Sequence, residues 1–224
     1  MKFFRLAGLL CCVFVFHSCN KQPESQQSKP MNADIELNDT DKYGLAVIRK
    51  HVWSGFCTPD DVDSMIDDVL EEDSHEDFLR ASVAPEFAKK HEAEKNWPEK
   101  TDCDLLDSAF DALEKRHILC LQNSGYEMSD GHQEAFEILS DQPGHQYVGY
   151  CFYHGQDLER AVDGGGLMVA FDHVDGDVPD KIKVGIALKE ELERVGFKIG
   201  WDGTAGQRIN IPHIDWKRRY RGGK

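Results

Sequence analysis

The sequence predicts an α/β fold, with α+β as the alternative, in which helices cover a mixed sheet of about five short strands. Two observations lead to this prediction. From residue 117 to 211, apolar runs of strand length alternate with amphipathic helical patterns, as expected for a sheet covered by helices. Residues 41–96 show helical patterns alone, which predicts an added N-terminal helical layer.

Three helices are expected in the N-terminal layer. The first covers about residues 41–54. The second has the clearest start, because Thr58 can cap it and Pro59 suits the first helical position. The third covers about residues 75–95, and Pro85 predicts a break within it because proline removes a backbone donor.

Trp97-Pro98 separates this layer from the α/β part, which begins with a helix near Asp102. Strands are then expected at residues 117–122, 147–153, 167–171, 198–201 and 208–211. Further helices are expected at residues 132–140, 156–163 and 180–195. The turn Asp202-Gly203-Thr204 predicts that the last two strands form a hairpin. The basic C-terminal residues 217–221 are expected to be a frayed, solvated end.

Two segments are expected to lie outside the fold. Residues 1–18 have a basic start and an apolar stretch of secretory length, typical of a signal peptide. Their end, Ser18-Cys19, resembles the lipobox of bacterial lipoproteins; an ordinary secretory signal is the alternative. Residues 19–40 are polar and predict a flexible tether. The folded part is then 41–96 with 97–221, expected as one compact unit.

The lipobox resemblance implies a location and a membrane contact. It implies cleavage before Cys19 and attachment of lipid, palmitate included, to that cysteine. The protein would then be anchored in the bacterial cell envelope. Where two membranes are present, Asn20 after the cysteine implies the outer one.

The chain is strongly acidic, with a net charge of −15 that becomes −17 when the two basic residues of the leader are removed. Nucleic acid is excluded as a partner, because binding to its phosphates requires a basic surface. An anionic membrane surface is disfavoured for the same reason, so membrane contact is expected through the lipid alone. Solubility is the simplest explanation of the acidity.

The folded part contains four cysteines, which allow three disulfide pairings: Cys57, Cys103, Cys120 and Cys151. Cys120 and Cys151 lie in apolar strand-like runs, which is more typical of buried thiols. The spacing of cysteines and histidines matches no metal-binding motif, so neither a metal nor another cofactor is expected.

Polar residues gather at the predicted strand-to-helix turn around His154 and Asp157. A histidine followed three residues later by an aspartate could form an acid/base pair, with the carboxylate orienting the imidazole. In the alternative, Asp157 complements the helix N-terminus and His154 only completes the turn. The sequence favours this alternative, because it ties no nucleophile to the pair.

Two further groups are candidates. Ser129 and Asp130 could belong to a hydrolase, but the G-x-S-x-G motif is missing and helix capping explains both residues. Asp202 and Arg208 flank one turn and could form an ion pair that is structural or that holds a polar ligand.

Four sequence elements carry a resemblance that covers residues 97–218. They are Gly125-Tyr126 with Ser129-Asp130-Gly131, the run Tyr150–Asp157, the glycines Gly164–Gly166, and Trp201–Thr204 with Arg208-Ile209. Together they resemble a bacterial family of domains of unknown function. The resemblance implies no established activity. It implies that one surface contains the candidates Tyr153, His154, Gln156, Asp157, Ser129, Asp130, Asp202 and Arg208.

Two functions are consistent with these observations. The first is a lipid-anchored binding module for a small ligand or a protein partner, an inhibitor or immunity role included. It is favoured because the sequence contains no complete catalytic motif. The alternative is an acid/base enzyme, with a hydrolase first among the choices. His154 would then act as base or acid, Asp157 would orient it, and Ser129 or Tyr153 would take part.

Overall fold

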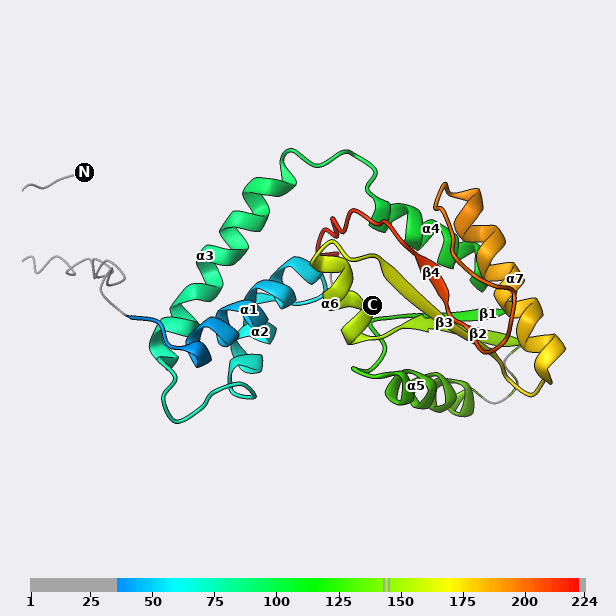
Figure 1. The fold of residues 1–224 in the computed structure, drawn as a ribbon, viewed down its shortest axis with the longest axis horizontal. Helices are drawn as coiled ribbons and strands as arrows, with labels where there is room; N and C mark the ends of the chain where they lie inside the picture. The colour runs from blue at the N-terminus through cyan, green and yellow to red at the C-terminus, as the bar shows by residue number, and fades with distance from the viewer. Residues whose placement is uncertain (1–35, 143, 145, 222–224) are drawn as a thin grey trace, which may run out of the picture. The chain divides into compact units, whose positions relative to one another are not determined.

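A layer of three helices is joined to a four-stranded mixed sheet in the computed structural model, which describes residues 36–142, 144 and 146–221 (Figure 1). The helices are α1 (Asp39–Ser54), α2 (Pro59–Ile66), α3 (Glu76–Glu94), α4 (Asp102–Glu114), α5 (Met128–Asp141), α6 (Gly155–Val162) and α7 (Val178–Arg194). The strands are β1 (Ile118–Gln122), β2 (Gly149–Tyr153), β3 (Leu167–His173) and β4 (Ile209–Ile211). The α/β prediction is confirmed. The predicted signal peptide and Cys19 lie outside the described residues.

The N-terminal helices begin where the sequence indicates. Thr58 caps α2 by accepting a hydrogen bond from the backbone of Asp61, and the Asp61 carboxylate accepts one from Thr58 in return. The break predicted at Pro85 is wrong, because α3 continues through it. Pro85 and Ala81 both lie on the exposed side of α3. Because Pro85 has no backbone N–H group, the Ala81 carbonyl loses its helical hydrogen-bond donor, and water can replace it.

Burial along the opposite side of α3 explains why the helix tolerates this proline. Leu79, Val83 and Phe87 are buried against α1 and α2. Each such side chain stabilises the fold by about 1.5–3 kcal/mol. Together they exceed the ~3 kcal/mol that an interior proline costs.

The sheet has the strand order β1-β2-β3-β4. The β1–β2 pair is parallel, and the other two pairs are antiparallel. A fifth strand at residues 198–201 is not formed, since only Gly200 makes a bridge, to Asn210. The indole of Trp201 donates to the carbonyls of Thr204 and Gln207, and these bonds turn the chain away from the sheet.

Helices α4 and α7 cover one face of the sheet, and α5 lies against the other (Figure 1). Side chains on β2 alternate between these faces, as strand geometry requires. Cys151 and Tyr153 enter the core formed with α4 and α7, whereas Phe152 packs on α5. The approach at α5 is close: a Cβ added to Gly131 would lie 2.1 Å from the Phe152 ring.

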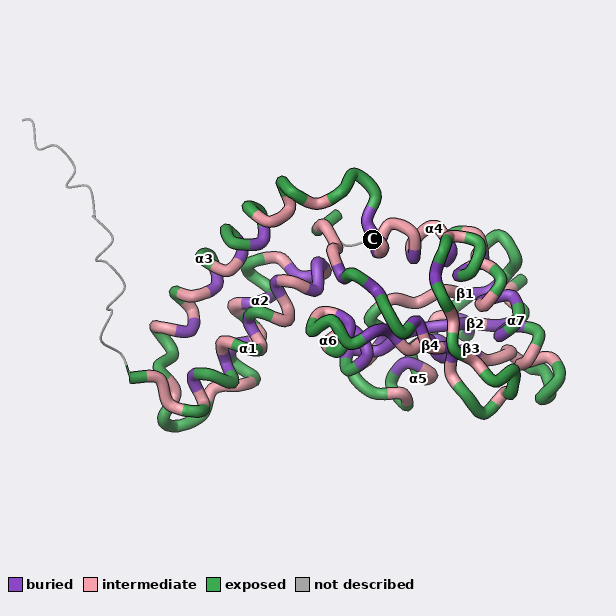
Figure 2. Tube along the Cα trace, turned by 45° about the horizontal axis from the view of Figure 1, so that its top comes forward, coloured by how far each residue is buried: buried purple, intermediate pink, exposed green. Residues whose placement is uncertain are grey.

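Two hydrophobic clusters stabilise the fold, and Figure 2 shows the buried positions running along the helices and through the middle of the sheet. One cluster belongs to α1, α2 and α3, and the other to the sheet with α4, α6 and α7. The C-terminal segment packs between elements instead of fraying. Trp216 is buried and its indole donates to the Ser54 carbonyl at 3.0 Å, while Arg218 donates to Asp107 at 3.0 Å.

Candidate ligand-binding site

His154 and Asp157 lie side by side at the point where β2 ends and α6 begins. His154 is the extended residue before α6, and Asp157 lies in the first turn of that helix. The helical spacing of three residues turns both side chains the same way. His154 Nε2 is 3.1 Å from Asp157 Oδ2, so the structure forms the contact that the sequence suggested.

Asp157 binds two arginines with its two carboxylate oxygens. Arg160 Nη2 donates to Oδ1 at 3.0 Å, and Arg208 Nη1 donates to Oδ2 at 2.7 Å. The carboxylate is almost fully buried, with 1% of the residue exposed. A buried charge of this kind is stable only when it is paired, so Asp157 fixes both guanidinium groups. The Asp202–Arg208 pair considered above is not formed, because Asp202 accepts its bonds from Thr204 within its own turn.

His154 supports this cluster rather than facing solvent. Only 4% of the residue is exposed, and its Nδ1 is buried with no hydrogen-bond partner among the described residues. Burial lowers the pKa of His154, against the attraction of Asp157, so the ring is neutral at pH 7. Its Nε2 lies between Asp157 and Arg208 Nη1, the latter at 3.2 Å. Nε2 is therefore engaged within the cluster, and Nδ1 is shielded from solvent.

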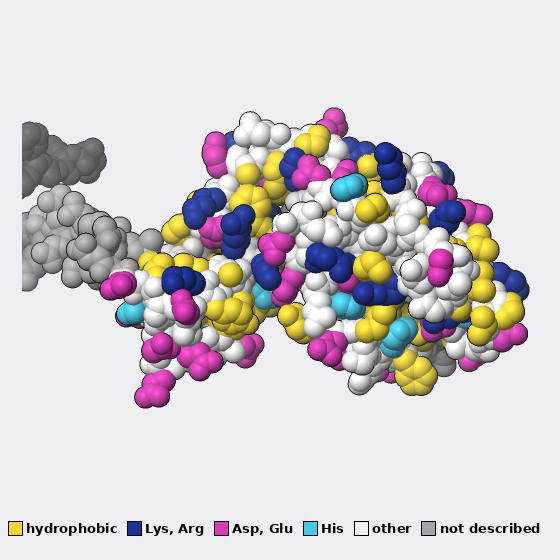
Figure 3. All heavy atoms as spheres, viewed as in Figure 1, with side chains coloured by type: hydrophobic (Ala, Val, Ile, Leu, Met, Phe, Trp, Pro, Cys, Tyr) yellow, Lys and Arg dark blue, Asp and Glu magenta, His cyan; other side chains and the backbone are white. Residues whose placement is uncertain are grey.

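Arg208 also lines a small hollow on the face of the sheet beside α5. We call it the Arg208 hollow; it has a volume of about 80 Å³. Its lining consists of Met128, His132, Ala170, Phe171, Lys181, Ala205, Gly206, Gln207 and Arg208. Figure 3 shows Lys, Arg and His side chains gathered in the middle of this face, between the places of α6 and α5 in Figure 1.

Arg208, Lys181 and His132 are each held by a partner outside the Arg208 hollow, and Gln207 accepts a hydrogen bond from the Asp202 backbone. Asp157 holds Arg208, as described above. Asp172 accepts a hydrogen bond from Lys181 Nζ at 2.9 Å. The Tyr150 hydroxyl lies 2.9 Å from His132 Nδ1. The donors are thus oriented before any ligand arrives, which lowers the entropic cost of binding.

The contact with Tyr150 determines which ring nitrogen of His132 carries the proton. Burial lowers the pKa of His132, so its ring is neutral, and burial raises the pKa of Tyr150 to about 12, so its hydroxyl keeps its proton. When that hydroxyl donates to Nδ1, the ring proton lies on Nε2. His132 then offers an N–H donor, like Lys181 and Arg208.

Tyr153 does not belong to this site. It is fully buried on the opposite face of the sheet, where its hydroxyl donates to Gln122 Oε1 at 2.9 Å. Gln156 is exposed, with its amide 3.5 Å from Glu127. The first backbone N–H groups of α6 donate to the carbonyls of Gly125 and Tyr126, so they are not open to a ligand.

Ser129 and Asp130 lie in the first turn of α5, which begins four residues before the predicted start at His132. The Asp130 carboxylate accepts from the backbone N–H groups of Glu127 and Tyr126, and these bonds lower its pKa. The Ser129 hydroxyl contacts only Asp130 among the described residues, at 3.4 Å. Asp130 therefore completes the start of the helix from inside its first turn, with Glu127 as the N-cap, whereas Ser129 makes no capping bond.

Sequence reasoning missed three residues of the site and misinterpreted another. Arg160 lies three residues after Asp157, and this helical spacing could have indicated the pair. Lys181 and Tyr150 have no local signal, because strand pairing and helix packing bring them to the site. His132 was expected as the first residue of a helix and not as a donor at the site. Within the part of the chain that the structure describes, no group of three or more His, Cys, Asp or Glu side chains is placed to hold a metal ion.

Replacement of Asp157 by Asn should destabilise the fold by roughly 2–3 kcal/mol in urea unfolding. A broken buried ion pair costs about 3–5 kcal/mol, and the lower figure reflects that both arginines reach solvent. Asp163→Asn is the matched control at the end of the same helix. Its exposed carboxylate is 3.8 Å from Lys50, so the loss should stay below ~1 kcal/mol. Equal losses in the two variants would refute the role of Asp157.

The lowered pKa of His154 predicts a loss of stability in acid. Below a pH of about 6.5 the unfolded chain binds a proton at this residue and the folded chain does not, so the free energy of unfolding falls as the pH falls. Urea unfolding between about pH 7.5 and 5.5 should show a weaker pH dependence in His154→Gln than in the wild type. The exposed His91→Gln controls for the loss of an imidazole. A wild-type slope in His154→Gln would contradict the assignment.

Comparison with known proteins identifies a family. No curated protein and no solved structure matches the chain. A family model described as a domain of unknown function, DUF6891, matches residues 38–220, a longer region than the resemblance noted in the sequence. This region contains the Arg208 hollow, the Asp157 cluster and the N-terminal helices. The chain therefore belongs to the DUF6891 family of domains of unknown function.

Proposed function

We propose that this protein is a binding module that recognises an anionic group, a carboxylate or a phosphate, on a small ligand or a protein partner. The observation that carries the proposal is the Arg208 hollow, in which Arg208, Lys181 and His132 are each held in place by a separate partner. Three oriented donors around one space suit an acceptor with several oxygens.

Size and charge both favour a single anionic group. A volume of about 80 Å³ accommodates two or three waters, at roughly 30 Å³ each, and hence one carboxylate or phosphate group. The cations nearby are Arg160, Arg208 and Lys181, and the carboxylates that hold them are Asp157 and Asp172. Arg208 and Lys181 thus place two cationic groups at the hollow, although the whole chain carries a net charge of −15.

The donors also keep capacity for a ligand. Among the described residues, Arg208 makes hydrogen bonds through Nη1 alone, so its Nη2 and Nε can still donate. Lys181 uses one of its three ammonium donors. The side chains of Arg208 and Lys181 are each 27% exposed, so a ligand can reach them from solvent.

The alternative function, an acid/base enzyme that uses His154 and Asp157, has less support. The 3.1 Å contact between the two side chains favours it. However, Nδ1 of His154 is buried, Nε2 is shared between Asp157 and Arg208, and Ser129 bonds to Asp130 in the first turn of α5. A binding module leaves its ligand unchanged, whereas an enzyme converts it.

Titration with inorganic phosphate and with malonate at constant ionic strength tests the proposal by thermal unfolding. A ligand that binds only the folded state adds about 2.7 kcal/mol at 100 times its dissociation constant. Lys181→Gln should weaken binding by about 10-fold or more, because a hydrogen bond to a charged group is worth about 1.5–3 kcal/mol. The ligand should be recovered unchanged.

Lys183→Gln is the matched control for this titration. Lys183 lies on the same helix as Lys181 and is exposed. Its ammonium group pairs with Asp180 at 2.6 Å, and it does not line the Arg208 hollow. The Lys183→Gln substitution removes the same charge as Lys181→Gln, but outside the hollow. The affinity of this variant for either anion should therefore equal that of the wild type. Equal weakening in both lysine variants, or no stabilisation by either anion, would refute anion binding at this site.

We further propose that the domain is lipid-anchored through Cys19 in the bacterial envelope, with its ligand outside the cytoplasm. The proposal rests on the basic start, the apolar stretch and Ser18-Cys19. No helix among the described residues is long and apolar enough to cross a membrane. The anchor would tether the domain to the membrane.

Palmitate labelling in a bacterial host tests the anchor. The wild-type chain should incorporate label and sediment with membranes, and Cys19→Ala should lose the label. Cys12→Ala lies within the same leader and should keep both properties. Labelling that survives Cys19→Ala would contradict the proposal.

A further inference from the structure

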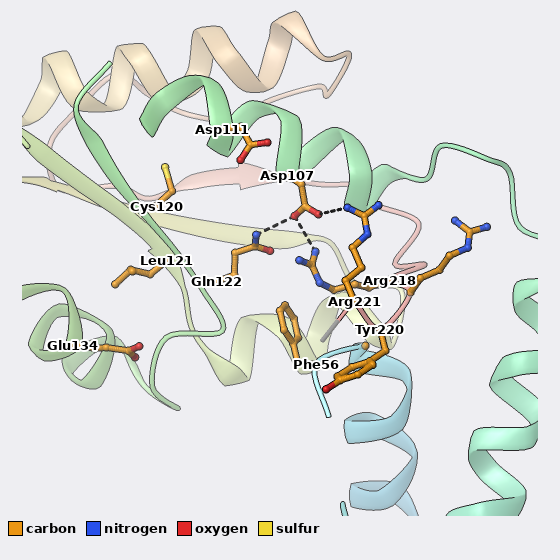
Figure 4. Close-up of a pocket in the computed structure, with 12 residues that line it drawn as sticks. Phe56, Asp107, Asp111, Cys120, Leu121, Gln122, Glu134, Arg218, Tyr220 and Arg221 are labelled. Carbon is orange, nitrogen blue, oxygen red and sulfur yellow. Dashed lines mark hydrogen bonds and ion pairs between the residues drawn. The ribbon is translucent and has the colours of Figure 1, made fainter. Parts of the chain in front are cut away.

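A cavity with a volume of about 480 Å³ lies at the edge strand β1, and its lining shares no residue with the Arg208 hollow (Figure 4). It is lined by Gly55, Phe56, Asp107, Asp111, Cys120, Leu121, Gln122, Glu134, Arg218, Arg219, Tyr220 and Arg221. Arginines from the C-terminal segment stand at one end, and Asp111 and Glu134 stand near β1. Charges of both signs therefore face the same space.

One of the lining residues, Cys120, has a second cysteine directly behind it. Cys120 on β1 is the register partner of Cys151 on β2, so the two side chains leave the sheet on the same face. Their sulfur atoms are 3.4 Å apart. Cys151 is fully buried, whereas Cys120 is only partly buried and lines the cavity. A partly buried thiol on the cavity wall thus has a fully buried thiol beside it.

We propose that Cys120 and Cys151 form a thiol–disulfide exchange site that reduces a small disulfide bound in this cavity. Cys120 is the attacking residue and Cys151 the resolving residue. The substrate class is a small disulfide that carries both amino and carboxylate groups, as glutathione disulfide does. Its carboxylates match Arg219 and Arg221, which would exchange their contacts with Asp104 for the substrate, and its ammonium groups match Asp111 and Glu134. This site is independent of the anion-binding function proposed above.

The exchange takes two steps that balance in atoms and electrons. The thiolate of Cys120 attacks one sulfur of the small disulfide, forms a mixed disulfide, and releases the other half as a thiolate that takes up a proton. The thiolate of Cys151 then attacks the Cys120 sulfur and releases the second half as a thiol. The two cysteines lose two electrons and two protons, and the substrate gains them.

The strand geometry allows the bond to form. Neighbouring strands lie about 4.8 Å apart, and disulfides occur at Cα separations of about 4.4–6.8 Å. The sulfur atoms must close from 3.4 Å to about 2.05 Å, a movement that side-chain rotation can supply. In the reduced protein, Cys151 donates to Cys120 Sγ, and Cys120 donates to the Ile118 carbonyl at 3.4 Å.

The other two cysteines of the fold provide internal controls. Cys57 and Cys103 are buried and free. Burial raises the pKa of the Cys103 thiol to about 12, and it also raises the pKa of Cys120 well above its usual value. Cys120 therefore differs from Cys57 and Cys103 in its position, at the cavity and beside Cys151, and not in a lowered thiol pKa. Because thiolates carry out the exchange and burial disfavours the Cys120 thiolate, the assay requires a strongly alkaline buffer in which the chain stays folded.

The test incubates the reduced, folded full-length chain with glutathione disulfide and maps the cysteines by alkylation and mass spectrometry. The expected result is a cross-link between Cys120 and Cys151, while Cys57 and Cys103 remain open to alkylation after unfolding. Cys151→Ala should stop after the first step and keep glutathione on Cys120. Cys120→Ala should leave Cys151 as a free thiol. Cys103→Ala should react like the wild type.

Two results would overturn the proposal. One is a folded chain that forms no Cys120–Cys151 cross-link under conditions where the chain unfolded in guanidinium reacts with glutathione disulfide. The other is consumption of Cys151 at the wild-type rate in Cys120→Ala, because Cys151 would then need no attacking partner. The wild-type result decides the question even where a cysteine variant fails to fold.

Discussion

The buried carboxylate of Asp157 is the interaction on which the arrangement of this face depends. Moving such a charge out of water costs several kcal/mol, which only close pairing offsets. Arg160 comes from the same helix, but Arg208 lies 51 residues further along the chain, just before β4. The carboxylate therefore ties the start of α6 to the far side of the sheet. The same carboxylate also fixes the guanidinium group of Arg208 in the Arg208 hollow. The burial of Asp157 therefore orients a hydrogen-bond donor in the hollow.

The alternation of side chains along β2 explains why one short run of sequence supports two separate sites. Tyr153 and His154 are adjacent, but strand geometry sends them to opposite sides. Tyr153 donates to Gln122, whose amide donates to Asp107 at 2.9 Å, and both of these residues line the large cavity at β1. His154 contacts Asp157 and Arg208 on the other side. The sequence motif therefore describes a strand between two sites, and not one surface.

Local interactions could be predicted from the sequence, and the choice of distant partners could not. Thr58 as a cap and His154 beside Asp157 depend on spacings of three residues, which a helix fixes. For Arg208 the sequence suggested only the nearby Asp202 as a partner, and the structure pairs it with Asp157 instead. The chain contains 41 acidic residues, and only the packing of α6 on the sheet determines which carboxylate is buried beside the guanidinium. The strand expected at residues 198–201 failed for a similar reason: the Trp201 indole found partners in its own turn.

The acidic surface places a condition on what the Arg208 hollow can bind. Charges separated by more than about 8 Å are largely screened at physiological ionic strength, so the net charge of −15 acts on a ligand mainly through nearby carboxylates. A small monoanion meets only the donors of the hollow. A polyanion extends beyond them and meets the surrounding acidic residues, which repel it. If the Arg208 hollow binds an anion as proposed, this distribution of charge favours an isolated anionic group on an otherwise neutral or basic carrier, because repulsion by the acidic surface then contributes to specificity.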